Sequence, residues 1–111
     1  MIIGIAGPYS DPDNEKKARN FAAINEVAAK VFELGHIPFI GLNMALPVVA
    51  NLNREEVCHE IMDISMAVID QCDALLVIGE SPGANRERDL ILSKGLPVYY
   101  TISEIPEVKK Q

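Results

Sequence analysis

The chain has 111 residues, enough for one domain that buries about two-thirds of the surface its unfolded form would expose, so residues 1–111 are expected to form a single domain. Its apolar fraction of 49% and charged fraction of 23% are ordinary for a globular protein and argue against a disordered chain. The formal net charge of −6 would repel a phosphate polymer, which excludes extended nucleic acid as an expected partner but not a small anion held by backbone N–H groups.

No segment of the sequence has the character of a membrane anchor or an export signal. The first six residues lack the basic start of a signal peptide, and no apolar run approaches the ~20 residues that cross a bilayer. Cys58 and Cys72 are not spaced as metal ligands, so reduced structural thiols are the default interpretation. The expectation is a cytoplasmic protein with no membrane partner.

The first half of the chain predicts two strands separated by a helix. Residues 2–6 form a nearly continuous apolar run, which is typical of a parallel strand buried on both faces. Asp11 can cap a helix that begins at Pro12 and ends before Gly35. The apolar residues of this helix recur at helical spacing. Residues 36–41 predict the second strand, and residues 42–52, which include Pro47, predict a loop with a short helical turn.

A helix with two apolar faces is predicted from Asn53 to about Gln71, with Glu56 completing a capping-box pattern at its start. One apolar stripe of this helix should pack on the sheet, and a second stripe lies ~80–180° away around the helix axis, at ~100° of rotation per residue. The first stripe comprises Val57, Ile61, Ile64 and Val68, and the second comprises Cys58, Met62, Met66 and Ile69. Because an exposed apolar patch usually marks an interface, the second stripe predicts a homo-oligomer, most simply a dimer, unless residues 42–52 fold back over it.

The second half predicts a strand at residues 73–79, a helix at 84–95 and a strand at 96–101. This alternation predicts an α/β fold of the flavodoxin or Rossmann type, with a doubly wound open parallel sheet of about four to five strands and helices on both faces. Ligands of such sheets bind at the carboxyl ends of the strands. The candidate site therefore lies at residues 7–9, after the first strand, and at residues 80–87, after the third.

Glu87 is the carboxylate best placed for chemistry in these segments. Residues 79–87, Gly-Glu-Ser-Pro-Gly-Ala-Asn-Arg-Glu, lead from a buried strand through a turn into a helix, whose N-terminus stabilises an anion by ~0.3–1 kcal/mol. This position predicts an ionised Glu87 that acts as a nucleophile at neutral pH. It also fits an ordinary Glu of a first helical turn, stabilised by the helix dipole.

Ile-Ala-Gly-Pro-Tyr at residues 5–9, Gln-Cys-Asp-Ala-Leu-Leu-Val at 71–77 and Ser-x-Gly-x-x-x-Glu at 81–87 together resemble the nucleoside 2-deoxyribosyltransferase superfamily, which includes nucleotide N-glycosidases. In that superfamily the Glu of the last segment attacks the anomeric carbon of the sugar, so the resemblance implies this role for Glu87. It implies that Ser81 contacts the 5′ end of a nucleoside monophosphate. It also implies a nucleoside or nucleotide as the partner and no metal or organic cofactor.

The two turns supply the other candidate residues. Tyr9 could orient Glu87 or touch the sugar, and a purely structural Tyr is an equal alternative. The substrate-binding candidates are Gly7, Ser81, Gly83, Ala84 and Asn85. Relatives commonly carry an Asp where this chain has Ser65, and Asp63 could replace it as a catalytic residue only if the helix is displaced.

Several alternatives remain open. Ser65 favours a non-catalytic nucleotide-binding module of the same fold, and a receiver-like signalling domain would need a phosphoacceptor Asp where Gly-Glu stands at residues 79–80. Asp11 and Asp13 could bind Mg²⁺, although helix capping explains them better. Arg19 and Arg86 could pair with a phosphate or lie solvated on the surface. The two histidines lack metal-ligand spacing and are assigned no chemistry.

Overall fold

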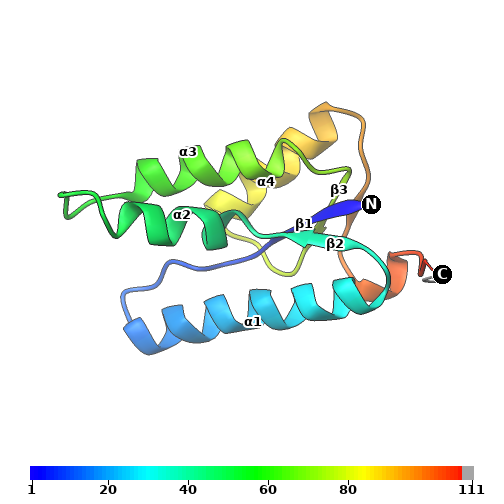
Figure 1. Cartoon of the computed structure of the whole chain (residues 1–111), viewed down its shortest axis with the longest axis horizontal. Coiled ribbons are helices and arrows are strands. Elements are labelled where there is room, and N and C mark those ends of the chain that lie inside the picture. The colour runs from blue at the N-terminus through cyan, green and yellow to red at the C-terminus, as the bar shows by residue number, and fades with distance from the viewer. Residues whose placement is uncertain (109–111) are drawn as a thin grey trace.

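A four-stranded, all-parallel sheet with the strand order β2-β1-β3-β4 forms the centre of the computed structural model, which describes residues 1–108 (Figure 1). The strands are β1 (Ile2–Ala6), β2 (Ile37–Phe39), β3 (Ala74–Val77) and β4 (Val98–Tyr99). The helices are α1 (Asn14–Glu33), α2 (Gly41–Val49), α3 (Cys58–Ile69) and α4 (Pro82–Ser93), and the 3-10 turn η1 (Ile102–Glu104) follows β4. The predicted doubly wound α/β fold is confirmed.

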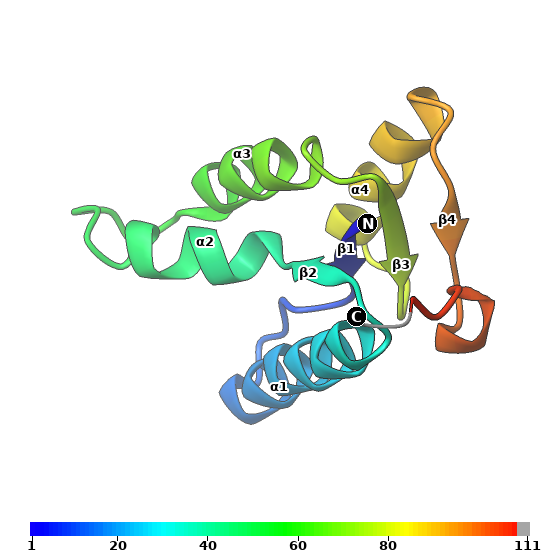
Figure 2. The same ribbon diagram turned by 45° about the vertical axis from the view of Figure 1, so that its right-hand side comes forward.

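Different helices cover the two faces of the sheet (Figure 2). Successive side chains of a strand point to opposite faces, so Ile3 and Ile5 of β1 pack with α1, whereas Ala6 packs with α3 and α4. The core on the α1 side comprises Ile3, Ile5, Ile24, Ala28, Val31, Ile40, Ala74, Leu76 and Ile105. The core on the other side comprises Ala6, Ile69, Cys72, Leu75, Val77, Ala84 and Ile91. Both central strands are therefore buried on both faces, as their apolar runs predict.

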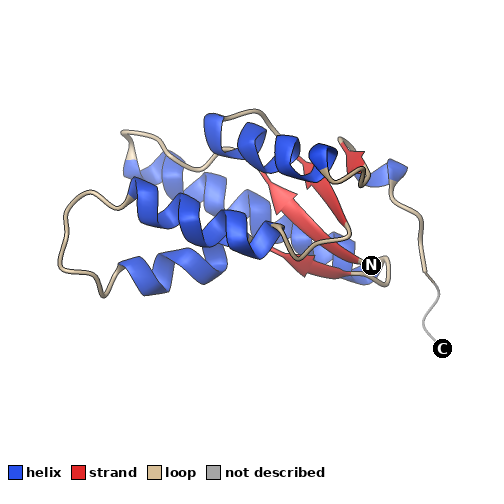
Figure 3. Ribbon diagram, turned by 90° about the horizontal axis from the view of Figure 1, so that it is seen from above, coloured by secondary structure: helices blue, strands red, loops and turns tan. Residues whose placement is uncertain are grey.

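The prediction of a loop over residues 42–52 is wrong, because α2 occupies most of that segment and forms a hairpin with α3 (Figure 3). Gly41, Ala45 and Val49 lie one turn apart on its buried face. The two helices approach closely at Gly41, where an added Cβ would lie 2.7 Å from the Cα of Ser65. This packing outweighs the cost of Pro47, which lacks the N–H that would bond to the preceding turn.

Three helix starts differ from the sequence prediction. The N-cap of α1 is Asp13, which accepts a hydrogen bond from the Glu15 N–H at 2.9 Å, while Asp11 accepts one from the Asp13 N–H. Helix α3 begins at Cys58 rather than Asn53, without a side-chain cap, so the capping-box prediction is wrong. Helix α4 begins at Pro82, two residues earlier than predicted, because Pro suits the first helical position.

The structure leaves only part of the second stripe of α3 available for a subunit interface. Ile69 is completely buried, and a Cβ added at Gly4 of β1 would lie 2.7 Å from its side chain. Met62 reaches Gly83 of α4, where an added Cβ would meet its methyl group at 2.9 Å. Ile69 and Met62 are thus covered by the sheet and α4 of the same chain, whereas Cys58 is exposed and Met66 is half-buried. Large apolar side chains are instead exposed on α2, at Met44 (59%) and Val48 (48%).

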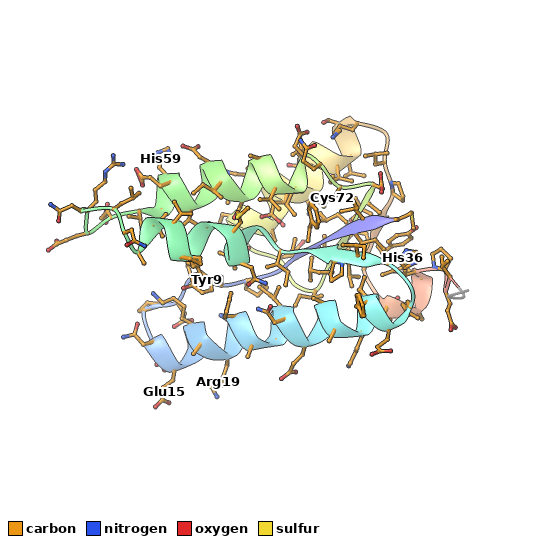
Figure 4. The ribbon with its side chains drawn as sticks, viewed as in Figure 1. Tyr9, Glu15, Arg19, His36, His59 and Cys72 are labelled. Carbon is orange, nitrogen blue, oxygen red and sulfur yellow. The ribbon has the colours of Figure 1, made fainter. Side chains whose placement is uncertain are left out.

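The segment after β4 is tied to the start of the chain through His36, which is buried (Figure 4). Its Nε2 lies 2.6 Å from the carbonyl oxygen of Pro106, and its Nδ1 lies 3.1 Å from the amino terminus. A histidine that accepts at Nδ1 and donates at Nε2 satisfies both contacts as the neutral tautomer. His36 is therefore a structural residue. Within residues 1–108, no helix combines the length and apolar character needed to cross a membrane.

Replacing Gly41 with Ala should lower the free energy of unfolding by ~1–3 kcal/mol, because the new methyl group would overlap Ser65. Intrinsic helix propensity predicts the opposite sign, since Ala is favoured over Gly by ~0.8–1 kcal/mol. Urea unfolding measures the difference. Met44→Ala, an exposed change on the same helix, should stay within ~0.5 kcal/mol of the wild type. A Gly41→Ala protein at least as stable as the wild type would contradict the close approach of α2 and α3.

Candidate functional site

A cavity of about 270 Å³ opens at the carboxyl ends of β1 and β3, where the strand order reverses. Ligand sites of open α/β sheets lie at such a reversal. The turns after β1 and β3 both contribute to its lining, as the sequence predicts, and α2 and α3 extend beyond the strands to wall it on another side (Figure 3). The lining includes Gly7, Tyr9, Ile24, Ile40, Leu42, Cys58, Ile61, Met62, Ser65, Ser81, Gly83, Ala84, Arg86 and Glu87.

The turn into α4 is built by Ser81, which is the N-cap of the helix. Its Oγ accepts a hydrogen bond from the Ala84 N–H at 3.0 Å, and its carbonyl oxygen accepts one from the Asn85 N–H at 2.8 Å. Pro82 has no N–H, so Gly83 supplies the remaining N–H of the first turn, which has no partner within residues 1–108. The hydroxyl proton of Ser81 is still free to be donated to a ligand.

Glu87 lies one turn after Gly83 on the same face of α4 and lines the cavity. Its side chain is only 8% exposed, yet its carboxyl group makes no hydrogen bond or ion pair in the described part of the chain. Burial raises the pKa of the Glu87 carboxyl to about 8. At pH 7 the resting side chain is therefore mostly protonated.

The prediction that Glu87 is ionised by the helix N-terminus is thus wrong, for a reason of position and magnitude. Helix α4 begins at Pro82, so Glu87 is the sixth helical residue and lies beyond the first turn, where the dipole effect has faded. An effect of ~0.3–1 kcal/mol cannot offset the desolvation of a buried carboxylate, which can shift a pKa by several units.

Tyr9 also lines the cavity, at the end of the turn after β1, and lies between α1 and α2 (Figure 4). Its ring packs edge-on against Phe21, with 6.2 Å between the ring centroids, and the Lys17 ammonium lies 5.7 Å from its centroid. These contacts fix the ring from the α1 side. They support the structural role of Tyr9 and leave it in position to contact a ligand.

Two of the predicted site residues are not brought to the cavity. Asp63 is exposed on the side of α3 opposite the buried Ser65, because two residues along a helix correspond to a rotation of about 200°. Asn85 does not line the cavity, and its side-chain oxygen accepts a hydrogen bond from Arg88. By contrast, Gly7, Ser81, Gly83 and Ala84 all lie in the lining.

The charged residues around the site have separate roles. Arg86 lines the cavity and is exposed, whereas Arg19 points away from it on the outer side of α1 (Figure 4). Among residues 1–108, no group of three or more His, Cys, Asp or Glu side chains is placed to hold a metal ion, and Asp11 and Asp13 bond to the backbone before α1. Cys72 is buried, which together with the charge of Asp73 raises the pKa of its thiol to about 12 and makes it unreactive.

The cavity wall formed by α3 was not predicted from the sequence. Cys58, Ile61 and Met62 line the cavity together with Leu42 at the start of α2. The sequence pattern that could have predicted this wall is the pair formed by Cys58 and the flexible Met62, which lie four residues apart on the same helical face. That pattern indicates a surface covered within the chain as readily as a subunit interface.

The fold and the cavity place the chain among doubly wound α/β proteins with a site at the reversal of strand order. A model of the family described as "Domain of unknown function (DUF4406)" matches residues 1–100, and the chain therefore belongs to this family. The match includes all four strands and all the residues that line the cavity. No curated protein matches the chain.

Replacing Glu87 with Gln is expected to stabilise the fold at neutral and alkaline pH. The folded-state pKa of about 8 lies above the ordinary value of 4.5, so the folded protein binds the proton more tightly than the unfolded chain does. The contribution of this carboxyl to stability is complete below pH ~4.5 and is lost as the pH rises to ~8. Gln carries no ionisable proton and avoids this loss, which we expect to reach ~2–4 kcal/mol at ~1.4 kcal/mol per pKa unit.

Urea unfolding of both proteins from pH 4 to pH 9 measures this effect. The Gln variant and the wild type should have similar stability near pH 4 and diverge as the pH rises. Glu80→Gln is the matched control, because it removes an exposed carboxylate from the turn before the same helix. Parallel pH profiles for the wild type and the Glu87→Gln variant would show that Glu87 is solvated in the folded protein.

Proposed function

We propose that this protein cleaves or transfers the N-glycosidic bond of a nucleoside or nucleoside 5′-monophosphate, with Glu87 as the group that attacks the anomeric carbon. The observation that carries the proposal is the position of Glu87, whose side chain is 8% exposed and whose carboxyl group, unbonded within residues 1–108, opens onto a cavity at the reversal of strand order. A carboxyl group that burial holds largely protonated, and that faces a cavity rather than a protein partner, favours a chemical role. The resemblance to nucleoside 2-deoxyribosyltransferases supports the same residue.

The reaction requires Glu87 to lose its proton before it attacks. Its Oε then forms a bond to the anomeric carbon as the bond from that carbon to the base breaks, through an oxocarbenium-like transition state. Water or a second base next displaces the carboxylate, which completes hydrolysis or transfer. Because the cavity excludes most water from Glu87, the ionised carboxylate is poorly solvated and correspondingly reactive.

Ser81 and the Gly83 N–H are the groups that we assign to the 5′ end of the substrate, and Tyr9 is placed to contact the sugar. The proposal needs no metal or organic cofactor, because the carboxylate and the substrate supply the bond changes. Self-association, most simply as a homodimer, stays a prediction. The exposed Met44 and Val48 make the outer face of α2 the better candidate for its interface than the buried face of α3.

A second candidate is a nucleotide-binding module that lacks catalytic activity. It is favoured by Ser65, which occupies the cavity position where relatives often have Asp, and by the exposed position of Asp63. Such a module would bind ligand in the same cavity and leave it intact.

Glu87→Gln should reduce N-glycosidic cleavage by at least ~10³-fold, since an amide is a poor nucleophile and the reaction depends on the carboxylate oxygen. In the wild type, kcat/KM should rise about tenfold per pH unit and level off above pH ~8, because this parameter reports the ionisation of the free enzyme. Release of free base from a panel of nucleosides and 5′-monophosphates, with and without a second base, measures both effects. Free base alone indicates hydrolysis, and a new nucleoside indicates transfer.

Glu80→Gln serves as the control and should retain wild-type turnover, because the Glu80 side chain is exposed and lies outside the cavity lining. Near-normal turnover by the Glu87→Gln protein would refute the assignment of the nucleophile. Tight binding of nucleotides without cleavage by the wild type would favour the non-catalytic module.

Ser81→Ala should weaken binding of a 5′-monophosphate by ~1.5–3 kcal/mol relative to the matching nucleoside, because a hydrogen bond to a charged group is lost. The change also removes the cap of α4, which costs ~1 kcal/mol of stability but affects both ligands alike. Calorimetric titration with the two ligands separates these effects. Equal losses for nucleoside and monophosphate would mean that Ser81 acts only as the helix cap.

A further inference from the structure

Within residues 1–108, the cavity offers a single carboxyl group to a bound substrate. Glu87 is the single Asp or Glu in the lining. The exposed Asp63 lies on the far side of α3, and the exposed Glu80 lies outside the lining, 4.0 Å from the Arg88 guanidinium. No second carboxyl group is therefore placed to share the chemistry with Glu87.

A neutral N-glycoside makes two demands on an enzyme. The anomeric carbon needs a carboxylate, and the departing nitrogen needs a proton, so glycosidases generally divide the two roles between a pair of carboxyl groups. Glu87 cannot be nucleophile and proton donor in the same step. The other ionisable groups in the lining are Tyr9, Cys58 and Arg86. An Arg stays protonated, and phenols and thiols are weaker acids than carboxyl groups.

A base with a permanent positive charge needs no proton on its departing nitrogen. We propose that the preferred substrate is an N-glycoside in which an aromatic ring nitrogen bonded to the sugar carries a fixed positive charge, as in a pyridinium riboside. Such a base leaves as a neutral molecule and needs no proton donor. Its charge also provides the counter-ion that the Glu87 carboxyl lacks among residues 1–108. This inference rests on the proposed N-glycosidic chemistry and specifies its substrate class.

The atoms and charges balance without a further reactant. A Glu87 Oε forms an ester bond to the anomeric carbon, the carbon–nitrogen bond breaks, and its electron pair neutralises the ring nitrogen. Water then attacks the anomeric carbon, the carboxylate departs, and the proton from the water passes to the solvent. Each hydrolysed cation therefore yields one neutral base, one free sugar and one proton.

The surroundings of Glu87 favour a planar cation. Apolar side chains such as Ile5, Ile24, Ile40 and Leu42 line the cavity, so an ion pair formed there is less screened than one on the surface. Arg86 is the cation in the lining, but its exposed side chain is screened by solvent. The net charge of −6 attracts a cation at long range.

Protonation provides a second signature of such a ligand. Burial raises the pKa of the resting Glu87 carboxyl to about 8, and an opposite charge at ion-pair distance favours its ionised form. Binding of a cation at pH 7 should therefore release a proton, whereas binding of a neutral ligand should not. Tyr9 after β1, Cys58 on α3 and Arg86 on α4 are the other titratable groups that line the same space.

The binding experiment compares the carbocyclic analogue of N-ribosylnicotinamide, a pyridinium that cannot be cleaved and so releases no proton by hydrolysis, with its neutral 1,4-dihydro form, which has nearly the same shape. Calorimetry at pH 7 in buffers of different ionisation enthalpy measures affinity and proton release for the wild type, Glu87→Gln and Glu80→Gln. The two variants remove the same charge, one from the cavity and one from the surface. Assays of base release with N-ribosylnicotinamide, uridine and inosine measure cleavage by the same three proteins.

We expect the cation to bind the wild type at least ~10-fold more tightly than the dihydro form, a difference of ~1.4 kcal/mol. Proton release should accompany binding of the cation to the wild type and Glu80→Gln. Both effects should vanish in Glu87→Gln. In the assays of base release, N-ribosylnicotinamide should be cleaved at least ~10-fold faster than the neutral nucleosides.

Equal binding of the charged and neutral forms, or cation preference that persists in Glu87→Gln, would overturn the inference. Glu87-dependent cleavage of uridine or inosine without cleavage of the cation would also overturn it and would leave the proposed N-glycosidic function intact. If no N-glycoside of either kind is cleaved, the catalytic proposal fails as well, even where the cation binds.

Discussion

The parallel pairing of β1 with β3 is the constraint on which the other features depend. The β1–β3 ladder is extended at one end by hydrogen bonds that join Ile2 with both the backbone N–H and the carboxylate of Asp73, and at the other end by the bond from Ile78 to Ala6. Because β2 and β4 lie on opposite sides of this pair, the chain reverses its direction across the sheet there. The turns after β1 and β3 are thereby held side by side. The cavity is a consequence of topology before any of its side chains is considered.

The α2–α3 hairpin adds a further wall to that crevice. Its helices pack closely where Gly41 meets Ser65, and Ile69 fits over Gly4 of the sheet. The hairpin is therefore fixed to the sheet at one end and projects beyond the strands at the other (Figure 3). The start of α2, at Leu42, and one face of α3, at Cys58, Ile61 and Met62, line the cavity. Glu87 of α4 lines the same cavity, and burial raises the pKa of its carboxyl. The raised pKa therefore arises in a site to which the hairpin contributes mainly apolar side chains.

The sequence was sufficient for the parts of the structure that depend on strong local patterns. Apolar runs predicted the four parallel strands, and Ser81 with Pro82 indicated the turn into α4. Helix α2 was missed because it contains Pro47 and its buried face consists of Gly41, Ala45 and Val49, so its helical character depends on packing with α3 rather than on local propensity. The ionisation of Glu87 could not be predicted either. It depends on burial by three separated segments of the chain, which no local pattern records.

The Glu87 carboxyl affects both the stability of the folded protein and the charge of the ligand that the cavity should prefer. Above its unfolded pKa the protein holds this group in a neutral form that costs stability, because no cation of the described chain pairs with it. A ligand that supplies the missing positive charge turns the same burial into an advantage, since an ion pair gains strength where water is excluded. Because such a ligand binds only the folded protein, its affinity also adds to the free energy of unfolding. Under the proposed substrate class, binding of the cation would therefore offset the stability that the unpaired carboxyl takes from the folded protein.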